Sequence, residues 1–430
     1  MDERLTAQIE ILESLVETGD FSGALDFLES LSQEERGQWQ IQNLTGIVCA
    51  CCGHLQEAET FFTSALEQTP EDLDIMYNLA DTYLMQKKCQ LAEEMISRCE
   101  AQDNDQALAE ALAQLRERLT IQRHEALDPI TQIFWERNYN YVWLKAMIEK
   151  AKQVNSTGST LVTGSSYGVN GILEHHWAKA VNCSSSSQDL YYDYLCAKNV
   201  LDSNAGHNFT RCFIIGGYYS PYHDDSKGKQ EIELAVSRVF DPIFGDTHNW
   251  KKTFQADLWA GLGNLSQEEK NFCEQRAIEK MTAQGTFFSK RKRRGGTIFN
   301  LGDRNWWDLS EQERLALGKI RADSHNKLFK HKDTFIENKK ILTKYAQFLH
   351  ENHVLPIFLI APFAEEYNHF VLKEMKKSVL KLISGISEEI RFVDFNQFNC
   401  FEPDDFVDTD HLSEKGAEKF SGLLVELFGK

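Results

Sequence analysis

Apolar residues recur along the first third of the chain with the spacing of an α-helix. Ala24, Ala58 and Ala92 stand 34 residues apart, and the third and fourth positions after each of them are also apolar. Residues three and four apart share one face of a helix. A period of 34 residues predicts three stacked pairs of helices, because one pair alone cannot bury its apolar face.

Turns between the paired helices are expected five residues before each alanine, at Gly19, Gly53 and Lys87. Such a turn favours a left-handed backbone, which glycine adopts at little cost. A plain helical bundle is the alternative, but it does not account for a period matched at several positions.

Residues 1–126 resemble tetratricopeptide repeats. The second unit carries the resemblance best, with Gly46, Ala58, Phe62, Ala65 and Pro70 at the positions of that family's pattern. The first and third units depart from it, because Leu12 and Ala80 occupy the first small position and neither unit has a closing proline. The resemblance implies a concave surface that holds a protein or peptide partner, or an array that packs on the rest of the chain.

The C-terminal two thirds carry five short apolar runs separated by segments with helical patterns. The runs are 161–163, 180–183, 212–215, 354–362 and 390–395. Strands that alternate with helices predict an α/β domain with a doubly wound parallel sheet, whose functional site lies at the carboxyl ends of the strands. We expect this domain over residues 156–430.

Two further segments complete the expected organisation. Asp128 and Pro129 offer an N-cap and a first helical residue, so residues 127–155 are expected to form a connecting helix. More than 120 residues separate the third and fourth strands. This distance predicts an insertion at about 221–320, either a lid over the site or a dimer contact.

Charge and apolar content argue against two classes of partner, nucleic acids and membranes. The formal net charge of −19 repels a phosphate backbone, so nucleic-acid binding is not expected. No apolar stretch has the length of a membrane span, and the first residues do not form an export signal. We therefore expect a cytoplasmic protein. Of the ten cysteines, Cys49, Cys51 and Cys52 lie together in a predicted helix interior, and the sequence has no second close pair to complete a zinc site.

A candidate nucleophile follows the first strand of the α/β domain, in the segment Gly164-Ser165-Ser166-Tyr167-Gly168. Near the other end of the chain, Asp408 precedes His411 by three residues. An acid at this spacing can orient the imidazole and stabilise the imidazolium that forms when histidine takes a proton from serine. The three residue types therefore point to acyl-ester chemistry.

A serine directly after the first strand and an Asp-x-x-His motif near the C-terminus are similar to the SGNH or GDSL hydrolase superfamily. The resemblance implies a flavodoxin-like three-layer fold, with Ser166 as nucleophile, His411 as base and Asp408 as its orienting acid. It also implies oxyanion or substrate contacts in the loops after the second and third strands, and we place these at Ser187, Gln188, Gly217 and Tyr218. Asp410 is a further candidate on the substrate side.

The chain departs from that family's pattern at two places. In the family's second conserved motif, after the second strand, a glycine donates its backbone N–H; here Ser187 takes that place and can still donate its own N–H. The third conserved motif, after the third strand, carries an asparagine that is missing here, and Tyr218 is the expected substitute as an oxyanion donor. Losing one such donor typically costs about 10²–10³ in turnover.

Three other interpretations of these motifs remain open. Gly164-x-Ser166-x-Gly168 also spells the nucleophile elbow of the α/β-hydrolase fold, although several strands precede the serine in that fold. Asp408, Asp410 and His411 could be metal ligands. The two aspartates could also simply cap the last helix.

The expected function is that of a serine-dependent esterase or acyltransferase, acting on O-acetyl groups of a carbohydrate or glycoconjugate. This chemistry requires no metal or organic cofactor. The alternative is an inactive protein of the same fold that serves as a scaffold and recruits a partner through the repeat array.

Overall fold

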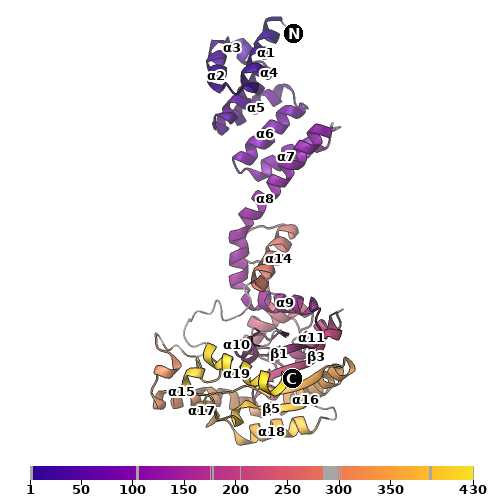
Figure 1. Ribbon diagram of the computed structural model, residues 1–430, viewed down its shortest axis with the longest axis vertical. Helices are drawn as coiled ribbons and strands as arrows, with labels where there is room; N and C mark the ends of the chain where they lie inside the picture. The colour runs from indigo at the N-terminus through magenta and orange to yellow at the C-terminus, as the bar shows by residue number, and fades with distance from the viewer. Residues whose placement is uncertain are drawn as a thin grey trace. The chain divides into compact units, whose positions relative to one another are not determined.

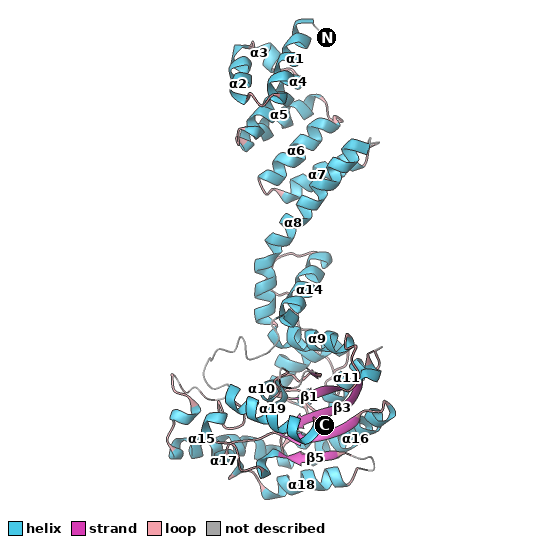
Figure 2. Cartoon of the chain, viewed as in Figure 1, coloured by secondary structure: helices cyan, strands magenta, loops and turns pink. Residues whose placement is uncertain are grey.

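A computed structural model describes residues 3–102, 106–174, 176, 179–203, 205–283, 299, 301, 303–386 and 390–429. The chain divides into two compact units, Met1–Ile130 and Thr131–Lys430. Helices make up the described part of the first unit, and the described strands lie in the second (Figure 2). None of the described helices has the length and apolar character that a membrane crossing needs.

The first unit consists of paired antiparallel helices (Figure 1). Its helices are α1 (Glu3–Glu17), α2 (Phe21–Ser30), α3 (Gln33–Arg36), α4 (Trp39–Cys51), α5 (Leu55–Gln68), α6 (Leu73–Met85), α7 (Cys89–Glu100) and the first part of α8 (Gln106–Arg137). The repeat explains the pairing, since Ala24, Ala58 and Ala92 are fully buried in α2, α5 and α7.

The turns within the pairs adopt the left-handed backbone expected from the sequence. Gly19 has φ +73°, Gly53 has φ +82° and Lys87 has φ +60°. Between α4 and α5, a Cβ on Gly46 would lie 2.6 Å from the ring of Phe62. The small residue therefore lets the two helices approach closely.

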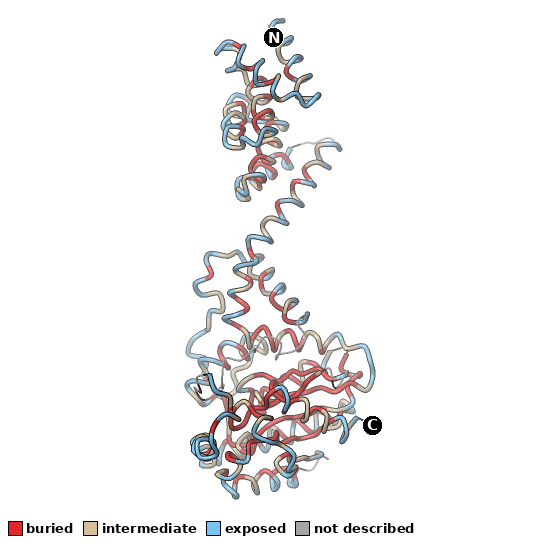
Figure 3. Tube along the Cα trace, turned by 60° about the vertical axis from the view of Figure 1, so that its left-hand side comes forward, coloured by how far each residue is buried: buried red, intermediate tan, exposed pale blue. Residues whose placement is uncertain are grey.

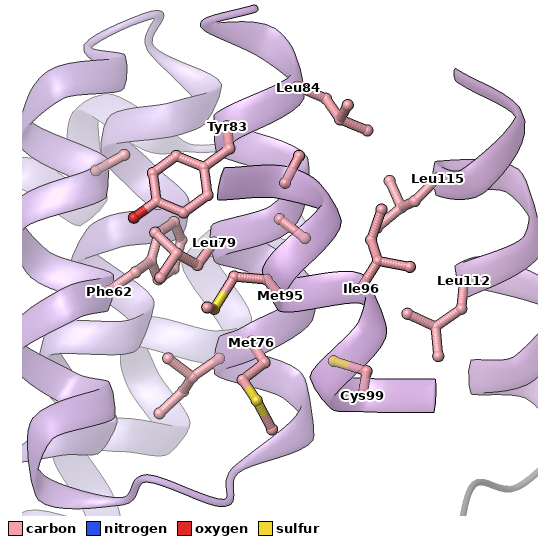
Figure 4. Packing of buried hydrophobic residues seen from close by; sticks show 14 of the residues in the cluster. Phe62, Met76, Leu79, Tyr83, Leu84, Met95, Ile96, Cys99, Leu112 and Leu115 are labelled. Atoms are coloured by element: carbon pink, nitrogen blue, oxygen red, sulfur yellow. The ribbon is translucent and has the colours of Figure 1, made fainter. Parts of the chain in front are cut away.

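A continuous apolar core joins the second and third helix pairs to α8 (Figure 4). Phe62 of α5 packs with Leu79 of α6 and Met95 of α7, and Leu112 and Leu115 of α8 extend the same core. The next helix in sequence thus covers the apolar face of the third pair, as stacking of repeats requires.

The connection between the repeats and the sheet differs from the expected single helix. α8 continues through Pro129 to Arg137, so Asp128 does not begin a helix. A proline inside a helix leaves the carbonyl four residues earlier without its usual donor. That residue, Glu125, is exposed. α8 ends before Asn138, and α9 (Tyr139–Lys152) follows.

Five parallel strands form the sheet of the second unit, as the alternation of strands and helices predicts. They are β1 (Ser159–Gly164), β2 (Ala180–Asn182), β3 (Phe209–Gly216), β4 (Leu355–Ile360) and β5 (Arg391–Asp394). Their order is β2-β1-β3-β4-β5, with Gly164 opposite Ile215 and Ile215 opposite Leu359. This is the strand order of flavodoxin-type doubly wound sheets.

Helices cover both faces of the sheet, so β1 and β2 are fully buried and β3 and β4 are mostly buried, whereas the edge strand β5 is partly exposed (Figure 3). Neighbouring residues of β3 show the two faces. Cys212 Sγ lies 3.3 Å from the hydroxyl of Tyr345 in α16 (Lys332–Glu351). The ring of Phe213 meets Phe428 of α19 (Glu414–Phe428) at 5.5 Å between centroids.

The remaining helices surround the sheet or lie between β3 and β4. The α-helices are α10 (Ser166–Gly171), α11 (Leu190–Leu201), α12 (Lys229–Glu231), α13 (Asp241–Phe244), α14 (Gln267–Ala283), α15 (Glu311–Asn326), α17 (Glu365–Asn368) and α18 (Lys373–Ser384). A π-helix spans Ile232–Phe240. Short 3₁₀ helices span Gly206–Asn208, Ser220–Tyr222, Asp225–Lys227, Trp306–Asp308, Lys327–Lys330, Phe395–Gln397 and Pro403–Asp405.

The segment expected as an insertion therefore contains several helices rather than one crossover helix. Of this segment, residues 284–298, 300 and 302 lie outside the described part of the chain. α16 is the helix that leads into β4, and it packs against both β4 and α11. α15 precedes it and contributes to the candidate site described below.

Candidate functional site

Ser166 begins α10 at the carboxyl end of β1, where two glycines allow very close packing. Gly164 has φ +143°, and a Cβ there would lie 2.3 Å from the carbonyl oxygen of Ile215. A Cβ on Gly168 would lie 2.1 Å from Ser184 Oγ. The glycines of the motif therefore place α10 tightly against β3 and the loop after β2.

This packing leaves one side chain accessible. Every residue from Ser159 to Leu173 is buried except Ser166, which is partly exposed. α10 is a short helix of 6 residues. It ends at Gly171, where a Cβ would lie 2.9 Å from the ring of Phe420 in α19. Direct contact with α19 follows (Figure 1).

The loop before α19 holds Asp408 and His411 in a fixed conformation. Val407 N–H donates to the carbonyl of His411 at 2.9 Å, and Phe406 and Leu412 form an antiparallel bridge. Asp408 Oδ1 accepts from the backbone N–H groups of Asp410 and His411 at 3.0 and 2.9 Å.

Neither aspartate of this loop caps the last helix. Ser413 is the N-cap of α19, and its side chain accepts from the N–H of Gly416. The capping interpretation of Asp408 and Asp410 is therefore wrong, and their carboxylates face other partners.

Ser166, His411 and Asp408 lie within hydrogen-bonding distance of one another. Ser166 Oγ is 2.8 Å from His411 Nε2. His411 Nδ1 is 3.0 Å from both carboxylate oxygens of Asp408. A carboxylate can only accept, so Nδ1 carries the proton and Nε2 is free to accept from the serine hydroxyl.

The charge around His411 favours its protonated form. Burial lowers the pKa of the imidazole, but the carboxylates of Asp408 and Asp410 outweigh burial, and the pKa of His411 is raised above its usual value. Arg321 opposes this shift. Such an imidazole can take and hold a proton from a neighbouring hydroxyl.

A polar cavity of about 250 Å³ opens beside Ser166. The segment after β2 and the start of α11 supply one side, lined by Ser187, Gln188, Asp189 and Asp193, with Glu231 from α12. One face of α15 supplies another side through Arg321, Ser324 and His325. Tyr219 and His223 also line the cavity.

Two of the expected substrate contacts lie at this cavity. Ser187 has φ +60°, a backbone that favours glycine, and its N–H has no hydrogen-bond acceptor among the described residues. Gln188 Nε2 donates to Asp193 Oδ1 at 2.7 Å. Burial raises the pKa of Asp193 well above its usual value, although this hydrogen bond opposes the shift.

Gly217 and Tyr218 do not line the cavity, contrary to the expectation from the sequence. The N–H of Gly217 donates to Ser220 Oγ at 2.9 Å. The hydroxyl of Tyr218 donates to Asp394 Oδ2 at the end of β5, at 2.7 Å. Tyr218 therefore points toward β5, and its hydroxyl is already engaged there.

Asp410 does not line the cavity. Its side chain is fully buried and accepts from Tyr167 Oη at 2.8 Å and from Thr409 Oγ1 at 2.8 Å. Arg321 Nε and Nη2 both approach Asp410 Oδ2 at 3.0 Å. Asp410 therefore holds Arg321 in place, and its Oδ1 lies 3.9 Å from His411 Nδ1.

The contribution of α15 was missed in the sequence. His325 is buried and lines the cavity, although the charged sequence around it is typical of a solvated helical face. Arg321 and His325 are four residues apart and so share a face. Charged residues surround them in the sequence, so no apolar stripe indicates which face is covered.

Within the part of the chain that the structure describes, two groups of side chains have donor atoms close enough to share a cation. These are Asp408, Asp410 and His411, and also Asp189, Asp224 and His248. In the first group, Asp410 already binds the Arg321 guanidinium, whose charge opposes a metal ion. In the second, Asp189 Oδ1 caps α11 and Asp224 accepts from Ser226, Lys227 and Asn249. Hydrogen bonds and ion pairs therefore account for both groups.

Comparison with known families identifies the repeats. Residues 53–115 match the tetratricopeptide repeat family. They span α5, α6, α7 and the start of α8, where the helical period is clearest. A search of curated proteins gives no match to the chain.

Proposed function

We propose that the second unit is a serine-dependent esterase or acyltransferase of the SGNH type. The observation that carries the proposal is the chain of hydrogen bonds from Ser166 through His411 to Asp408, at the mouth of a polar cavity. The 2-1-3-4-5 strand order and the position of Ser166 directly after β1 also support the resemblance to that superfamily.

The geometry supports a two-step reaction. Ser166 Oγ attacks the acyl carbon while His411 Nε2 takes the serine proton, and Asp408 stabilises the imidazolium. The ester C–O bond then breaks, and the leaving alcohol takes the proton from His411. Water, or the hydroxyl of an acceptor, attacks the acyl-serine by the same proton transfers and releases Ser166.

Backbone N–H groups are suitable donors for the negative oxygen of the intermediate. The N–H groups of Ser166 and Ser187 have no acceptor among the described residues, and both residues line the cavity. Such donors stabilise charge that develops in the transition state, which is the usual role of an oxyanion hole.

The cavity favours a short acyl group on a hydroxyl-rich molecule. Its wall contains the amide of Gln188 and the carboxyl groups of Asp189, Asp193 and Glu231, which can exchange hydrogen bonds with sugar hydroxyls. A volume of about 250 Å³ leaves little room for a long acyl chain. We therefore propose O-acetyl groups on a carbohydrate or glycoconjugate as the substrate.

Acetate release from 4-nitrophenyl acetate and from O-acetylated sugars tests this function. Ser166→Ala and His411→Ala should each lower kcat by about 10³-fold or more. The catalytic residues act as a unit, so replacing one of them removes most of the rate enhancement that all of them provide. Ser384→Ala removes an exposed serine far along the sequence, at the end of α18, and should change nothing. Equal activity in Ser166→Ala and the unmodified protein contradicts the proposal.

The repeat unit has a separate proposed role. Tetratricopeptide repeats often mediate protein interactions, and stacked helix pairs present an extended surface suited to a peptide. We infer that residues 53–115 recruit a protein partner. Pull-down with the full chain, compared with a variant carrying substitutions on the repeat surface, tests this role independently of ester hydrolysis.

A further inference from the structure

The proposed acyl transfer lacks one hydrogen-bond donor. The third donor expected from the segment after β3 is absent, because Gly217 N–H and Tyr218 Oη are bound to Ser220 and Asp394. α15 also contributes to the cavity wall, next to this segment. A side chain that takes over as hydrogen-bond donor to the oxyanion must point into the same cavity as Ser166 and must carry a proton to donate.

His325 is buried beside this cavity and held firmly by two aromatic residues. Its relative exposure is 5%. The ring of Tyr219 stacks on the imidazole with 3.8 Å between centroids. Nδ1 lies 2.6 Å from the hydroxyl of Tyr367. These contacts fix the ring and leave Nε2 as the atom available to the cavity.

The hydroxyl of Tyr367 determines which nitrogen of His325 carries the proton. Tyr367 is completely buried, and His325 Nδ1 is its only hydrogen-bond partner among the described residues. A buried hydroxyl needs an acceptor for its proton, so Tyr367 donates and Nδ1 accepts. A neutral imidazole with an accepting Nδ1 has its proton on Nε2.

The surroundings keep this imidazole neutral. Burial lowers the pKa of His325 well below its usual value, and the positive charge of Arg321 lowers it further. His223 and His411 act in the same direction when they are charged, whereas Asp410 opposes the shift. Tyr219 and Tyr367 are the remaining titratable groups packed on the ring, and burial raises the pKa of both. His325 is therefore unsuited to serve as a second base.

Arg321 is a weaker candidate for the same task, although it also lines the cavity. Its Nε and Nη2 are committed to the carboxylate of Asp410. The ion pair holds the guanidinium against the loop of His411. Its main effect at the site is electrostatic, on the two histidines.

We propose that His325 is a catalytic residue that donates its Nε2–H to the oxyanion formed at the acyl carbon attacked by Ser166. The inference rests on the proposed function. It assigns to a neutral histidine of α15 the part that an asparagine side chain plays in the superfamily. Tyr367 is the positioning residue that sets the tautomer of His325.

A spectroscopic test does not depend on activity. In protein labelled with ¹⁵N-histidine, the resonances lost in His325→Gln identify this ring. We expect a protonated Nε2 and an unprotonated Nδ1 at every pH from 5 to 8. The opposite tautomer, or protonation of both nitrogens near pH 6, overturns the inference whether or not the protein hydrolyses esters.

The kinetic test separates His325 from the proposed nucleophile. His325→Ala should lower kcat by about 10²–10³-fold with little change in KM, and His325→Gln, which keeps a donor, should lose less. His331→Gln makes the same exchange at an exposed histidine and should match the unmodified protein. The pH at half-maximal kcat/KM should not move in His325→Gln, because that ionisation belongs to His411.

The outcomes of the kinetic test are distinguishable. Full activity in His325→Ala overturns the role of His325 and leaves the esterase intact. Loss of the ionisation in His325→Gln shows that His325 is a base and also overturns it. An inert unmodified protein overturns the proposed function, and this role falls with it. If His325→Ala does not fold, Tyr367→Phe, which removes one hydroxyl, should still lower kcat about 10-fold, and unchanged kcat overturns the inference.

Discussion

At the scale of single residues, His411 connects the two ends of the candidate site. Its Nε2 faces Ser166 and its Nδ1 faces Asp408. Asp410 adds a second negative charge, and that charge is partly neutralised by Arg321. The balance among these groups sets the pH range in which the imidazole is neutral and can accept a proton.

Replacing Asp408 with asparagine tests this balance. Asp408→Asn should lower kcat about 10²–10⁴-fold, because the imidazole loses the partner that fixes its tautomer. The raised pKa of His411 means that kcat/KM falls as the pH drops toward and below 6.5. In Asp408→Asn this fall should move to lower pH, because one charge that raises the pKa is gone.

The pH–rate profile of kcat/KM is the measurement, with Asp404→Asn as control. Asp404 is an exposed carboxylate of the same region, paired with Lys415, so its replacement should leave the profile unchanged. A profile in Asp408→Asn that coincides with that of the unmodified protein contradicts a role for Asp408 beside His411.

Asp225 is a buried carboxyl group without hydrogen-bond partners at either oxygen among the described residues. Burial, followed by the charges of Asp189 and Glu231, raises its pKa well above the usual value. The folded state therefore binds a proton that the unfolded chain releases, and stability decreases as the pH rises from about 4 through the folded pKa.

Asp225→Asn should stabilise the second unit by about 1–3 kcal/mol at pH 7.5 and by less at pH 4.5. Urea unfolding followed by tryptophan fluorescence measures this, because only Trp39 of the eight tryptophans lies before residue 131. Equal or lower stability of Asp225→Asn at pH 7.5 indicates that an ionised Asp225 has a stabilising partner.

At the scale of elements, the positions of the strands along the chain follow from apolar runs in the sequence, whereas the lengths of the helices do not. Each of the five runs becomes a strand with its end shifted by a few residues. The length of α10 and the passage of α8 through Pro129 depend on neighbouring elements. A propensity scan cannot show the close approach of Gly171 to Phe420 or the exposure of Glu125.

In the candidate site, too, some residues can be predicted from the sequence and others depend on tertiary packing. Ser166, Asp408 and His411 belong to short motifs at strand and helix ends, so the sequence indicates them directly. The wall formed by α15 depends on how a largely polar helix packs across the strand ends. Tyr218 was misplaced because the sequence does not show that Asp394 of β5 binds its hydroxyl.

Gly416 tests how α19 positions the loop of His411. A Cβ on this residue would lie 1.9 Å from the carbonyl oxygen of Asp405. Gly416→Ala should therefore displace the start of α19 and lower kcat by about 10-fold or more, since misplacement by about 1 Å can cost 10²-fold.

Gly422 is the matched control, because it lies on the same helix with open space where a Cβ would be. Gly422→Ala should keep full activity and stabilise the helix by about 0.5–1 kcal/mol. Equal kcat in the two variants shows that α19 does not set the position of His411.

At the scale of the whole molecule, all residues of the candidate site lie in the second unit, and the tetratricopeptide match lies in the first. Phe62→Ala should destabilise the first unit by about 3–5 kcal/mol, because Phe62 is fully buried in its core. Hydrolysis of a small acetyl ester should stay within about twofold of the unmodified protein, since no contact of Ser166 or His411 is removed.

Hydrogen exchange in α4 to α7 reports the destabilisation, and the ester assay reports the site. Ile121→Ala, at an exposed residue of α8, should affect neither quantity. If Phe62→Ala loses ester hydrolysis as well as the stability of the repeat core, the first unit is needed for the chemistry itself. That outcome contradicts this division of roles.

The central claim is that Ser166 is a nucleophile activated by His411. Reaction of the full chain with a fluorophosphonate, followed by mass spectrometry of the labelled peptide, tests it most directly. The account predicts one adduct on Ser166, none on Ser165, and no adduct in His411→Ala that remains folded. A folded protein in which Ser166 stays unmodified, or labelling that persists without His411, contradicts the account.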